Sequence, residues 1–427
     1  MWRYSFVLSL RSLLRLLACT VWGRVLVYPA LARNERSAAT LNAYVARRTA
    51  ALGWPALPDA TRLHDVPPGA ALLAKHELRH DPARHVRPRR PGSLLRNTIR
   101  TSGTSGAPLT LVQSLGAAIR EEAFVHRQLR WIGWRPGQRR AWIRGDIVCA
   151  DQPAHGRYWC HDRVGKRLLL SSYHLSGATI GAYIAALETY DPVVIQAYPS
   201  SVAALASWLE AAGRRYAGGA LKGVLTSSET LEPAVRASVR RAFGVAVFDW
   251  YGQAERVAAI GTCEQGRYHL LTDYGAAELL PGGEGQYELV GSSLNNAAMP
   301  LGRYRTGDRV VPGAPQACPC GRVFPTLAAV VGRQERILTL PDGRIVARLD
   351  RVFQGHDRCL IEGQVRYHGQ ARFTLRVVVT DAFTARDDAA LRASFLLRVP
   401  GVQVAVERVD AISRGPNGKF EFIWAAP

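Results

Sequence analysis

A regular alternation of segments between Ala117 and Gly244 constrains the fold of this 427-residue chain more than any other feature. Stretches with apolar residues at helical spacing predict helices, and short runs of β-branched and aliphatic residues predict strands. Strands that alternate with helices in this way build βαβ units around a mostly parallel sheet. The predicted helices span 117–132, 179–190, 200–212 and 232–243, and the predicted strands span 141–148, 193–197, 223–226 and 245–250.

The pattern changes after Tyr251, where glycine and proline become frequent and short strands such as 286–290 replace helices. A second change comes near Gly332, after which strands are predicted at 360–367, 373–380 and 402–406, with a helix at 387–397 capped by Asp387. We therefore predict an α/β fold with two domains. The large N-terminal domain, residues 1–332, carries the mostly parallel sheet, its helices and a β-rich subdomain, and a small, mobile α+β domain follows at residues 333–427.

The formal net charge of +21 is compatible with nucleic acid, an anionic membrane surface or anionic small molecules as partners. The densest basic run, five arginines between Arg79 and Arg90, is interpreted as a solvated loop. Nearly all basic residues are arginines spread along the chain, which is typical of a compositional bias, so we expect no nucleic-acid partner. The lysines are Lys75, Lys166, Lys222 and Lys419.

The N-terminal residues 6–17 are largely apolar but are interrupted by Arg11 and Arg15. No stretch reaches the ~20 apolar residues that a membrane-spanning helix needs. We expect an amphipathic helix that packs on the protein, with contact to a membrane surface as the alternative. The seven cysteines are an odd number in a large chain, which disfavours a disulfide framework and favours a cytoplasmic location.

The run at 101–108 alternates hydroxyl residues with glycines and ends in Pro108. Glycine lets backbone N–H groups approach a phosphate, and serine and threonine add hydroxyl donors. The run is not a Walker A loop, because the following Lys-Ser/Thr pair is missing. It is either a phosphate-binding loop or an ordinary polar turn.

Four further motifs follow this run, at 250–255, 304–308, 332–337 and 417–420. Each is weak alone, but all five in this order resemble the adenylate-forming ligase superfamily over nearly the whole chain, from about Leu73 to Phe422. Within it the chain is similar to the phenylacetate–CoA ligase and CapK-like branch, on the segments 196–200, 226–230, 318–322 and 349–353.

The resemblance implies the roles of individual residues. Tyr251 would stack on the adenine of ATP, Asp308 would accept hydrogen bonds from the ribose, and Glu255 would help to hold Mg²⁺. Lys419 would bridge the substrate carboxylate and the α-phosphate; an exposed lysine in a turn is the alternative. The small domain would rotate about Glu335 between two half-reactions. The remaining nucleotide contacts would be Ser102, Gly103, Thr104, Ser105, Gly106, Ser228, Glu229, Gly252 and Arg333, and the acyl pocket would contain Tyr198, Pro199 and Trp250.

Three positions depart from the superfamily pattern. Ala254 stands where threonine is usual, Glu335 where aspartate is usual, and Ala107 where a lysine often follows the phosphate loop. These departures leave room for slow or altered chemistry.

A metal site is the second predicted constellation. Cys263, His269, Cys318 and Cys320 provide three thiolates and an imidazole, which suit a tetrahedral structural Zn²⁺. The spacing Cys-x-Cys is weak by itself, and relatives in this branch can carry zinc at such positions. The alternative is buried cysteines and one surface histidine.

The resemblance implies that the protein activates a small carboxylic acid, aryl or arylacetic, with ATP to form an acyl-adenylate. The acceptor would be coenzyme A, a carrier-protein thiol or an amine. Two alternatives remain open: transfer of AMP to a deazaflavin-type cofactor, and a non-catalytic binding protein. No Gly-x-Ser-x-Gly motif supports a hydrolase.

Overall fold

The computed structural model describes residues 2–89, 93–101, 109–146, 148, 157–314, 316–331, 338–346, 349–353, 356, 359–412 and 422–425. Its helices are α1 (Trp2–Arg15), α2 (Tyr28–Asn34), α3 (Ala38–Leu52), α4 (Lys75–His80), α5 (Leu115–Trp131), α6 (Ile180–Tyr190), α7 (Pro199–Ala211), α8 (Pro233–Phe243) and α9 (Ala385–Leu396). Two π-helical segments, Leu16–Thr20 and Gly23–Val27, lie between α1 and α2, and short 3₁₀ turns span Ala83–His85 and Leu349–Phe353.

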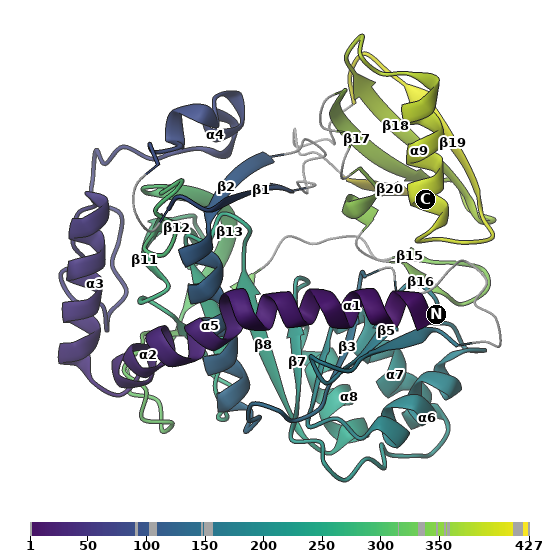
Figure 1. The fold of residues 1–427 in the computed structure, drawn as a ribbon, viewed down its shortest axis with the longest axis horizontal. Coiled ribbons are helices and arrows are strands. Elements are labelled where there is room, and N and C mark those ends of the chain that lie inside the picture. Colours follow the sequence, from purple (N-terminus) through teal and green to yellow (C-terminus); the bar gives the residue numbers. More distant parts are fainter. Residues whose placement is uncertain are drawn as a thin grey trace.

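Within this described part of the chain, twelve strands form one mixed sheet in the order β11-β12-β13-β14-β10-β9-β8-β7-β6-β3-β5-β4 (Figure 1). In its parallel half, β5, β3, β6, β7 and β8 run in the same direction, and the edge strand β4 is antiparallel to β5. The strands of this half are β3 (Arg140–Arg144), β4 (Trp159–Asp162), β5 (Arg167–Ser171), β6 (Val194–Ala197), β7 (Gly223–Ser227) and β8 (Ala246–Gly252).

In the antiparallel half, all neighbours from β8 to β11 run in opposite directions. Its strands are β9 (Ala259–Thr262), β10 (Tyr268–Leu270), β11 (Gly275–Pro281), β12 (Tyr287–Ser293), β13 (Tyr304–Pro312) and β14 (Thr326–Val331). The region after Tyr251 is thus rich in strands, as predicted. It continues the parallel sheet directly, because β9 pairs with β8, and does not form a separate sheet.

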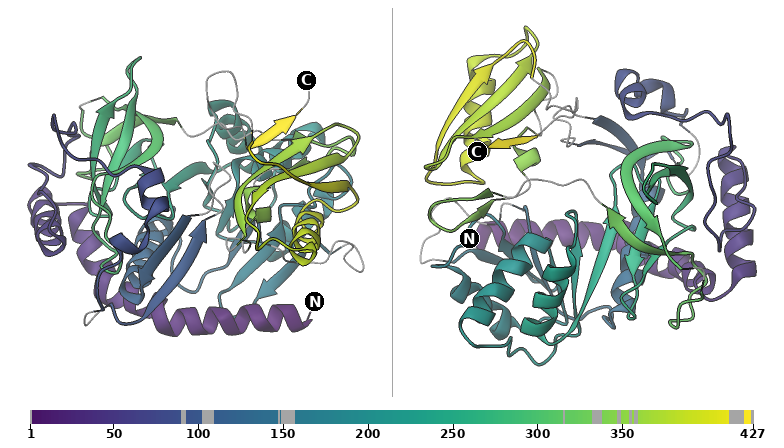
Figure 2. Two further views of the ribbon diagram at one scale, coloured as in Figure 1. Left: turned by 90° about the horizontal axis from the view of Figure 1, so that it is seen from above. Right: turned by 180° about the vertical axis from the view of Figure 1, so that it is seen from behind.

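Three helices, α6, α7 and α8, cover one face of the parallel half (Figure 2). Side chains alternate along each strand, so Ala141 and Ile143 of β3 point into this core while Arg140, Trp142 and Arg144 belong to the opposite face. The core consists of aliphatic residues from both layers, among them Ile184, Ile195, Leu205, Val224 and Val239.

The opposite face is covered by α5 and by the N-terminal helical segment, which runs along the outside of the molecule (Figure 2). A helix is formed there, as predicted, but it turns its apolar side to solvent. Phe6 is 60% exposed and Leu14 is 59% exposed, whereas Ser12 is buried. The helix packs through Ser9 and Ser12, whose hydroxyls hydrogen-bond to the β4–β5 region, so polar contacts fix its orientation.

The C-terminal part has its own sheet, in the order β19-β18-β17-β20, with α9 packed against it (Figure 1). Its strands are β17 (Leu360–Tyr367), β18 (Arg372–Val379), β19 (Gln403–Arg408) and β20 (Ile423–Ala425). The short pairs β1 (Arg96–Thr101) with β2 (Leu109–Ser114) and β15 (Leu338–Thr339) with β16 (Ile345–Val346) complete the described strands.

The cap of α9 differs from the prediction. Thr384 is the N-cap residue, and Asp387 lies one turn inside the helix, where its Oδ2 accepts hydrogen bonds from the Thr384 N–H at 2.9 Å and the Thr384 hydroxyl at 2.6 Å. This reciprocal arrangement is a capping box, whose sequence pattern of threonine followed three residues later by an acid allows either residue to be taken for the cap.

The α/β class is confirmed as a large mixed sheet with helices and a small C-terminal sheet. The predicted boundary at 332/333 lies outside the described residues.

Candidate active site and metal cluster

Predicted site residues follow three neighbouring parallel strands at the points where those strands end. Tyr198 comes directly after β6, Ser228 directly after β7, and Tyr251 and Gly252 end β8. Because β6, β7 and β8 are parallel neighbours, these residues lie along one edge of the sheet. Ligands of open α/β sheets bind at this carboxyl edge.

Tyr251 and Asp308 come together although 57 residues separate them. The Tyr251 hydroxyl donates a hydrogen bond of 2.8 Å to Asp308 Oδ2, and Asp308 lies on β13 in the antiparallel half. Burial, followed by the charge of Asp308, raises the pKa of Tyr251 well above its ordinary value. Tyr251 therefore stays protonated and orients the Asp308 carboxylate.

Glu255 lies in the loop after β8 and is only 8% exposed. Its Oε1 accepts a hydrogen bond of 2.8 Å from the Tyr304 hydroxyl. The ammonium of Lys75, at the start of α4, lies 3.8 Å from the same oxygen. A buried carboxylate costs free energy unless it is paired and hydrogen-bonded, and these two groups meet that need.

Glu229 has a positioning role at this edge. Its Oε2 accepts a hydrogen bond of 2.9 Å from the Ser200 N–H and its Oε1 one of 3.0 Å from the Ser200 hydroxyl, at the first turn of α7. A carboxylate at this end of a helix offsets the partial positive charge of the free N–H groups. The preceding residue, Ser228, has φ of 74°, a left-handed conformation that non-glycine residues adopt at a cost.

A cavity of about 510 Å³ lies between the parallel half of the sheet and its cover of α5 and the N-terminal helices. Trp250 lines it, together with Trp142, Trp134 and Leu225, so part of its wall is aromatic. Tyr198 and Pro199, the other predicted pocket residues, are both buried where α7 begins, and Pro199 occupies the first helical position.

The rest of the cavity wall is strongly basic. Arg140 stacks over Trp134 at 4.7 Å and donates to Gln196 Oε1 at 3.3 Å, while its buried Nε has no hydrogen-bond partner among the described residues. Burial, followed by the charge of Arg167, lowers the pKa of Arg140 to about 10, which keeps the guanidinium charged at neutral pH. Buried donors normally have a partner, so this wall is suited to an anion. The cationic lining residues are Arg15, Arg24, Arg140, Arg144, Lys166 and Arg167, and the acidic ones are Glu121 and Glu122.

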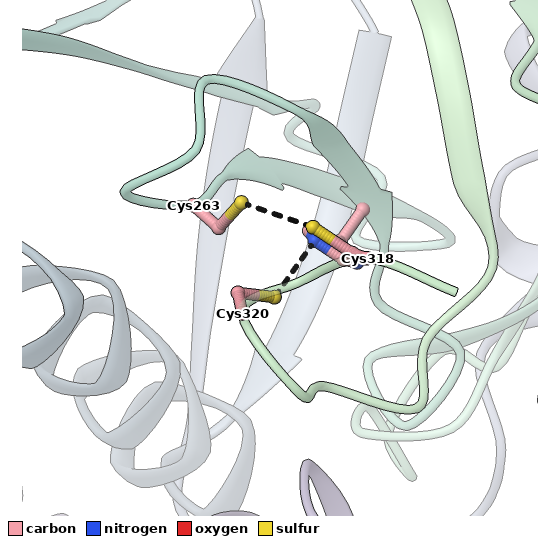
Figure 3. A group of neighbouring side chains, drawn as sticks. Cys263, Cys318 and Cys320 are labelled. Atoms are coloured by element: carbon pink, nitrogen blue, oxygen red, sulfur yellow. Dashed lines mark hydrogen bonds between the residues drawn. The ribbon is translucent and has the colours of Figure 1, made fainter. Parts of the chain in front are cut away.

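The four predicted metal ligands lie together beside β9, β10 and β14 of the antiparallel half. Figure 3 shows the three cysteines of this group. The four ligand atoms all lie within 4.8 Å of one another, and all four side chains are buried. Cys263 follows β9, His269 belongs to β10, and Cys318 and Cys320 lie in the loop before β14. Cys263 Sγ lies 3.7 Å from Cys318 Sγ, and Cys320 Sγ lies 3.4 Å from His269 Nε2.

This cluster fits a tetrahedral zinc ion in donor type and in orientation. His269 Nδ1 lies 3.3 Å from the Phe324 carbonyl oxygen, which directs Nε2 toward the thiols. Burial lowers the pKa of His269 to about 4, so the imidazole is neutral at pH 7, the form that ligates metals. Burial raises the pKa of Cys263 to about 12.

No protein-family model matches the chain. Over 210 residues the chain is 21% identical to Protein CapK of Staphylococcus aureus; this match covers 49% of the chain and 46% of CapK. The chain is a distant homologue of CapK. This confirms the resemblance to CapK at the level of distant homology, and the chain spans about half the length of that relative.

Solved structures of ligases are also similar. A 2-hydroxyisobutyryl-CoA ligase in complex with 2-HIB-AMP and CoA aligns over 93% of this chain and 89% of its own, with 18% identity and a TM-score of 0.49. The amide bond synthetase Mcba of Marinactinospora thermotolerans aligns over 78% of this chain and 69% of its own, with 17% identity and a TM-score of 0.40. Both TM-scores fall below 0.5.

Several predicted residues lie outside the described part of the chain: the loop Ser102, Gly103, Thr104, Ser105 and Gly106, together with Arg333, Glu335 and Lys419. Their roles remain predictions.

Two features of the site were not predicted from the sequence. Lys75 pairs with Glu255 across 180 positions of sequence, and its rarity as one of four lysines was the one available signal. The basic cavity had no signal, because its arginines come from separate segments of an arginine-rich chain.

Proposed function

We propose that this protein uses ATP to convert a carboxylic acid into an acyl-adenylate and then transfers the acyl group to a thiol or amine. One observation carries the proposal: the pairs Tyr251–Asp308 and Glu255–Tyr304 lie at and just beyond the carboxyl end of β8. Their order in sequence matches the superfamily, and the homology to CapK supports it. We infer the ligase fold, with a mobile domain from residue 333, on the same grounds.

Each residue has a defined task in this proposal. Asp308 accepts hydrogen bonds from the ribose hydroxyls while the Tyr251 hydroxyl holds its carboxylate in place. Glu255 is a suitable oxygen ligand for Mg²⁺, because its carboxylate is buried and oriented by Tyr304. Such an ion would neutralise charge on the phosphates of ATP. Lys419 bridges the acid and the α-phosphate, and Lys75 balances the charge of Glu255 when no cation is bound.

The cavity beside Trp250 is the proposed acyl pocket. Its indole walls favour an aromatic acid over a flexible fatty acid, because flat rings stack on them. Arg140 begins β3, four residues before Arg144 at the strand's carboxyl end, which corresponds to about 13 Å along the strand. An acid whose far end carries a second anionic group, or another strong acceptor, would satisfy the free Arg140 Nε.

We also propose that the Cys263, His269, Cys318 and Cys320 cluster holds a structural Zn²⁺. All four positions of a tetrahedral ion would be filled by protein atoms, which leaves no place for substrate or water. The ion would join the β9–β10 turn to the loop before β14.

The test is ATP–pyrophosphate exchange against aryl, arylacetic and fatty acids, each with and without a second carboxylate. We expect exchange with an aromatic acid and its collapse in Lys419→Ala. Lys222→Ala is the matched control, because Lys222 is exposed and its ammonium donates to the Gly133 carbonyl oxygen at 3.4 Å, away from the candidate site. Absence of exchange in protein that binds ATP, with AMP recovered in a cofactor product, would replace the ligase by a nucleotidyltransferase. Absence of ATP binding would rule out both enzymes.

A further inference from the structure

The N-terminal helical segment exposes a continuous apolar stripe. Of the fourteen large apolar side chains that are exposed among the described residues, ten lie between Phe6 and Leu26. Exposed apolar residues scattered singly are ordinary, but a contiguous patch marks an interaction site. The ten are Phe6, Val7, Leu10, Leu13, Leu14, Leu17, Val21, Trp22, Val25 and Leu26.

Helical spacing places most of these residues on one face. From Phe6 to Val25 the stripe advances in steps of three or four residues through positions 10, 14, 17 and 21, and Leu13 lies beside it, three residues after Leu10. The two π-helical segments widen the turn between Leu16 and Val27, which keeps Leu17, Val21 and Val25 in line.

The opposite face holds the helix tightly against the protein. The Ser12 hydroxyl donates to Asp162 Oδ2 at 2.5 Å and accepts from Arg167 Nη2 at 2.7 Å, in a buried position. Leu8 packs on the cluster that contains Cys160, and Gly23 lies so close to α5 that a Cβ atom would be 2.6 Å from the Ile119 carbonyl oxygen. The helix is therefore fixed along the surface with its apolar stripe outward.

By length and composition, the helical stretch Phe6–Asn34 is long and apolar enough to cross a membrane, although only 11% of its most apolar window is buried. The expectation that no stretch is apolar enough was therefore wrong, because isolated arginines interrupt the run without lowering its mean hydropathy enough. A spanning arrangement would require the helix to leave the body and break the Ser12–Asp162 contact. An arrangement in the plane of the membrane keeps every contact.

Charge indicates which surface the stripe fits. Residues 2–34 contain five arginines and no acidic residue. The loop between β4 and β5, whose Arg163 N–H donates to Ser9 Oγ at 3.1 Å, adds the exposed side chains of Arg163, Val164 and Lys166 beside the helix. Apolar residues beside basic ones are the pattern of helices that lie in the interface of anionic bilayers.

We propose that residues 6–26, with the adjoining loop 163–166, bind the protein in the plane of an anionic lipid bilayer. The apolar stripe inserts between the acyl chains near the headgroups, and the exposed side chains of Arg11, Arg163 and Lys166 contact lipid phosphates. This proposal is independent of the reaction that the protein catalyses.

The test is flotation of the full-length protein with phosphatidylcholine vesicles that contain none or one quarter phosphatidylglycerol. We expect at least ten-fold stronger binding to the anionic vesicles, weakened by 0.5 M salt. The triple variant Leu10→Gln, Leu14→Gln, Leu17→Gln should lose binding at least ten-fold without unfolding, because these side chains are exposed. The matched control Leu94→Gln, Leu95→Gln, Leu397→Gln changes three equally exposed leucines elsewhere and should bind as before.

Three outcomes would overturn the proposal. The first is equal behaviour of the wild type and the triple variant. The second is a wild-type dimer that the triple variant dissociates while neither binds vesicles, which would make the stripe an interface between copies. The third is an intact mass that lacks the N-terminal residues, which would make the segment a cleaved signal.

Discussion

The two halves of the twelve-stranded sheet differ in how their strands are connected and in which contacts stabilise them. In the parallel half, a helix follows each of β5, β6 and β7, so the ends of β6, β7 and β8 lie along one edge and present Tyr198, Ser228 and Tyr251 there. In the antiparallel half, no helix lies between successive strands of the described chain, and side-chain contacts between distant segments contribute to its stability. They include the Cys263–His269–Cys318–Cys320 cluster and the buried pair of Arg127 with Asp273. The topology of the parallel half brings site residues to one edge, and the antiparallel half adds Asp308 and Tyr304 to the site through long-range side-chain contacts.

The largest expected effect is loss of the metal cluster. Cys318→Ser should remove about one zinc ion per chain and lower the free energy of unfolding by at least about 5 kcal/mol, because a structural zinc site contributes its binding energy to folding. Metal analysis and urea unfolding measure both quantities. The control is Cys160→Ser on β4, since both cysteines are 4% exposed; it should keep the metal. A wild-type protein without bound metal, even from zinc-supplemented cells, would contradict the prediction.

The second effect concerns the buried ion pair. Arg127 donates to both oxygens of Asp273, at 2.7 and 3.0 Å, and the two side chains are 1% and 0% exposed. Arg127→Ala leaves a buried charge without its partner and should cost about 3–5 kcal/mol of stability in urea unfolding.

The same substitution at Arg241 is its counterpart in the parallel half. Arg241 pairs with Glu210 at 3.0 Å on the surface, where a pair contributes at most about 1 kcal/mol. Similar losses of stability for Arg127→Ala and Arg241→Ala would show that the ion pairs of the two halves contribute equally to stability.

The third effect separates chemistry from stability. Glu255→Gln should lower ATP–pyrophosphate exchange about 100-fold, the size expected when a preorganised electrostatic group is removed. Glu278 on β11 is also 8% exposed and pairs with Arg303 at 2.9 Å. Glu278→Gln should lower stability and leave exchange in the folded protein unchanged. If both variants lose exchange equally, the strand-end residues have no special role.

The smallest expected effect is a pH dependence of the free energy of unfolding, caused by His126 in the cavity wall. Burial, followed by the charge of Arg24, lowers the pKa of His126 from 6.5 to about 4. The folded state thus resists protonation, and the stability that neutral His126 contributes above pH 6.5 is lost as the pH falls toward 4. Between pH 6.5 and pH 4 the wild-type protein should lose about 1–2 kcal/mol of unfolding free energy through this residue, and His126→Phe should abolish that loss. An unchanged pH profile would mean that solvent or an anion reaches the imidazole.

Local periodicity was enough to predict helices α5 to α8 and strands β3, β6, β7 and β8 of the parallel half, but not β4 and β5. The predicted helix 232–243 is α8, Pro233–Phe243, and the predicted strand 193–197 is β6, Val194–Ala197. Both signals depend on neighbours within about ten residues. The cluster of Cys263, His269, Cys318 and Cys320 was also predicted from the sequence, because these residue types are rare in this chain and chemically restricted.

The tertiary structure decided what depends on contacts between distant segments. The sequence predicts strands after Tyr251, but only pairing of β9 with β8 joins them to the parallel sheet. It predicts an amphipathic N-terminal helix, but the Ser12–Asp162 bond turns the apolar face outward. Lys75 meets Glu255, and Tyr251 meets Asp308, only once the chain has folded. The physical reason is that periodicity specifies which face of an element is apolar, whereas long-range packing and polar partners determine what that face contacts.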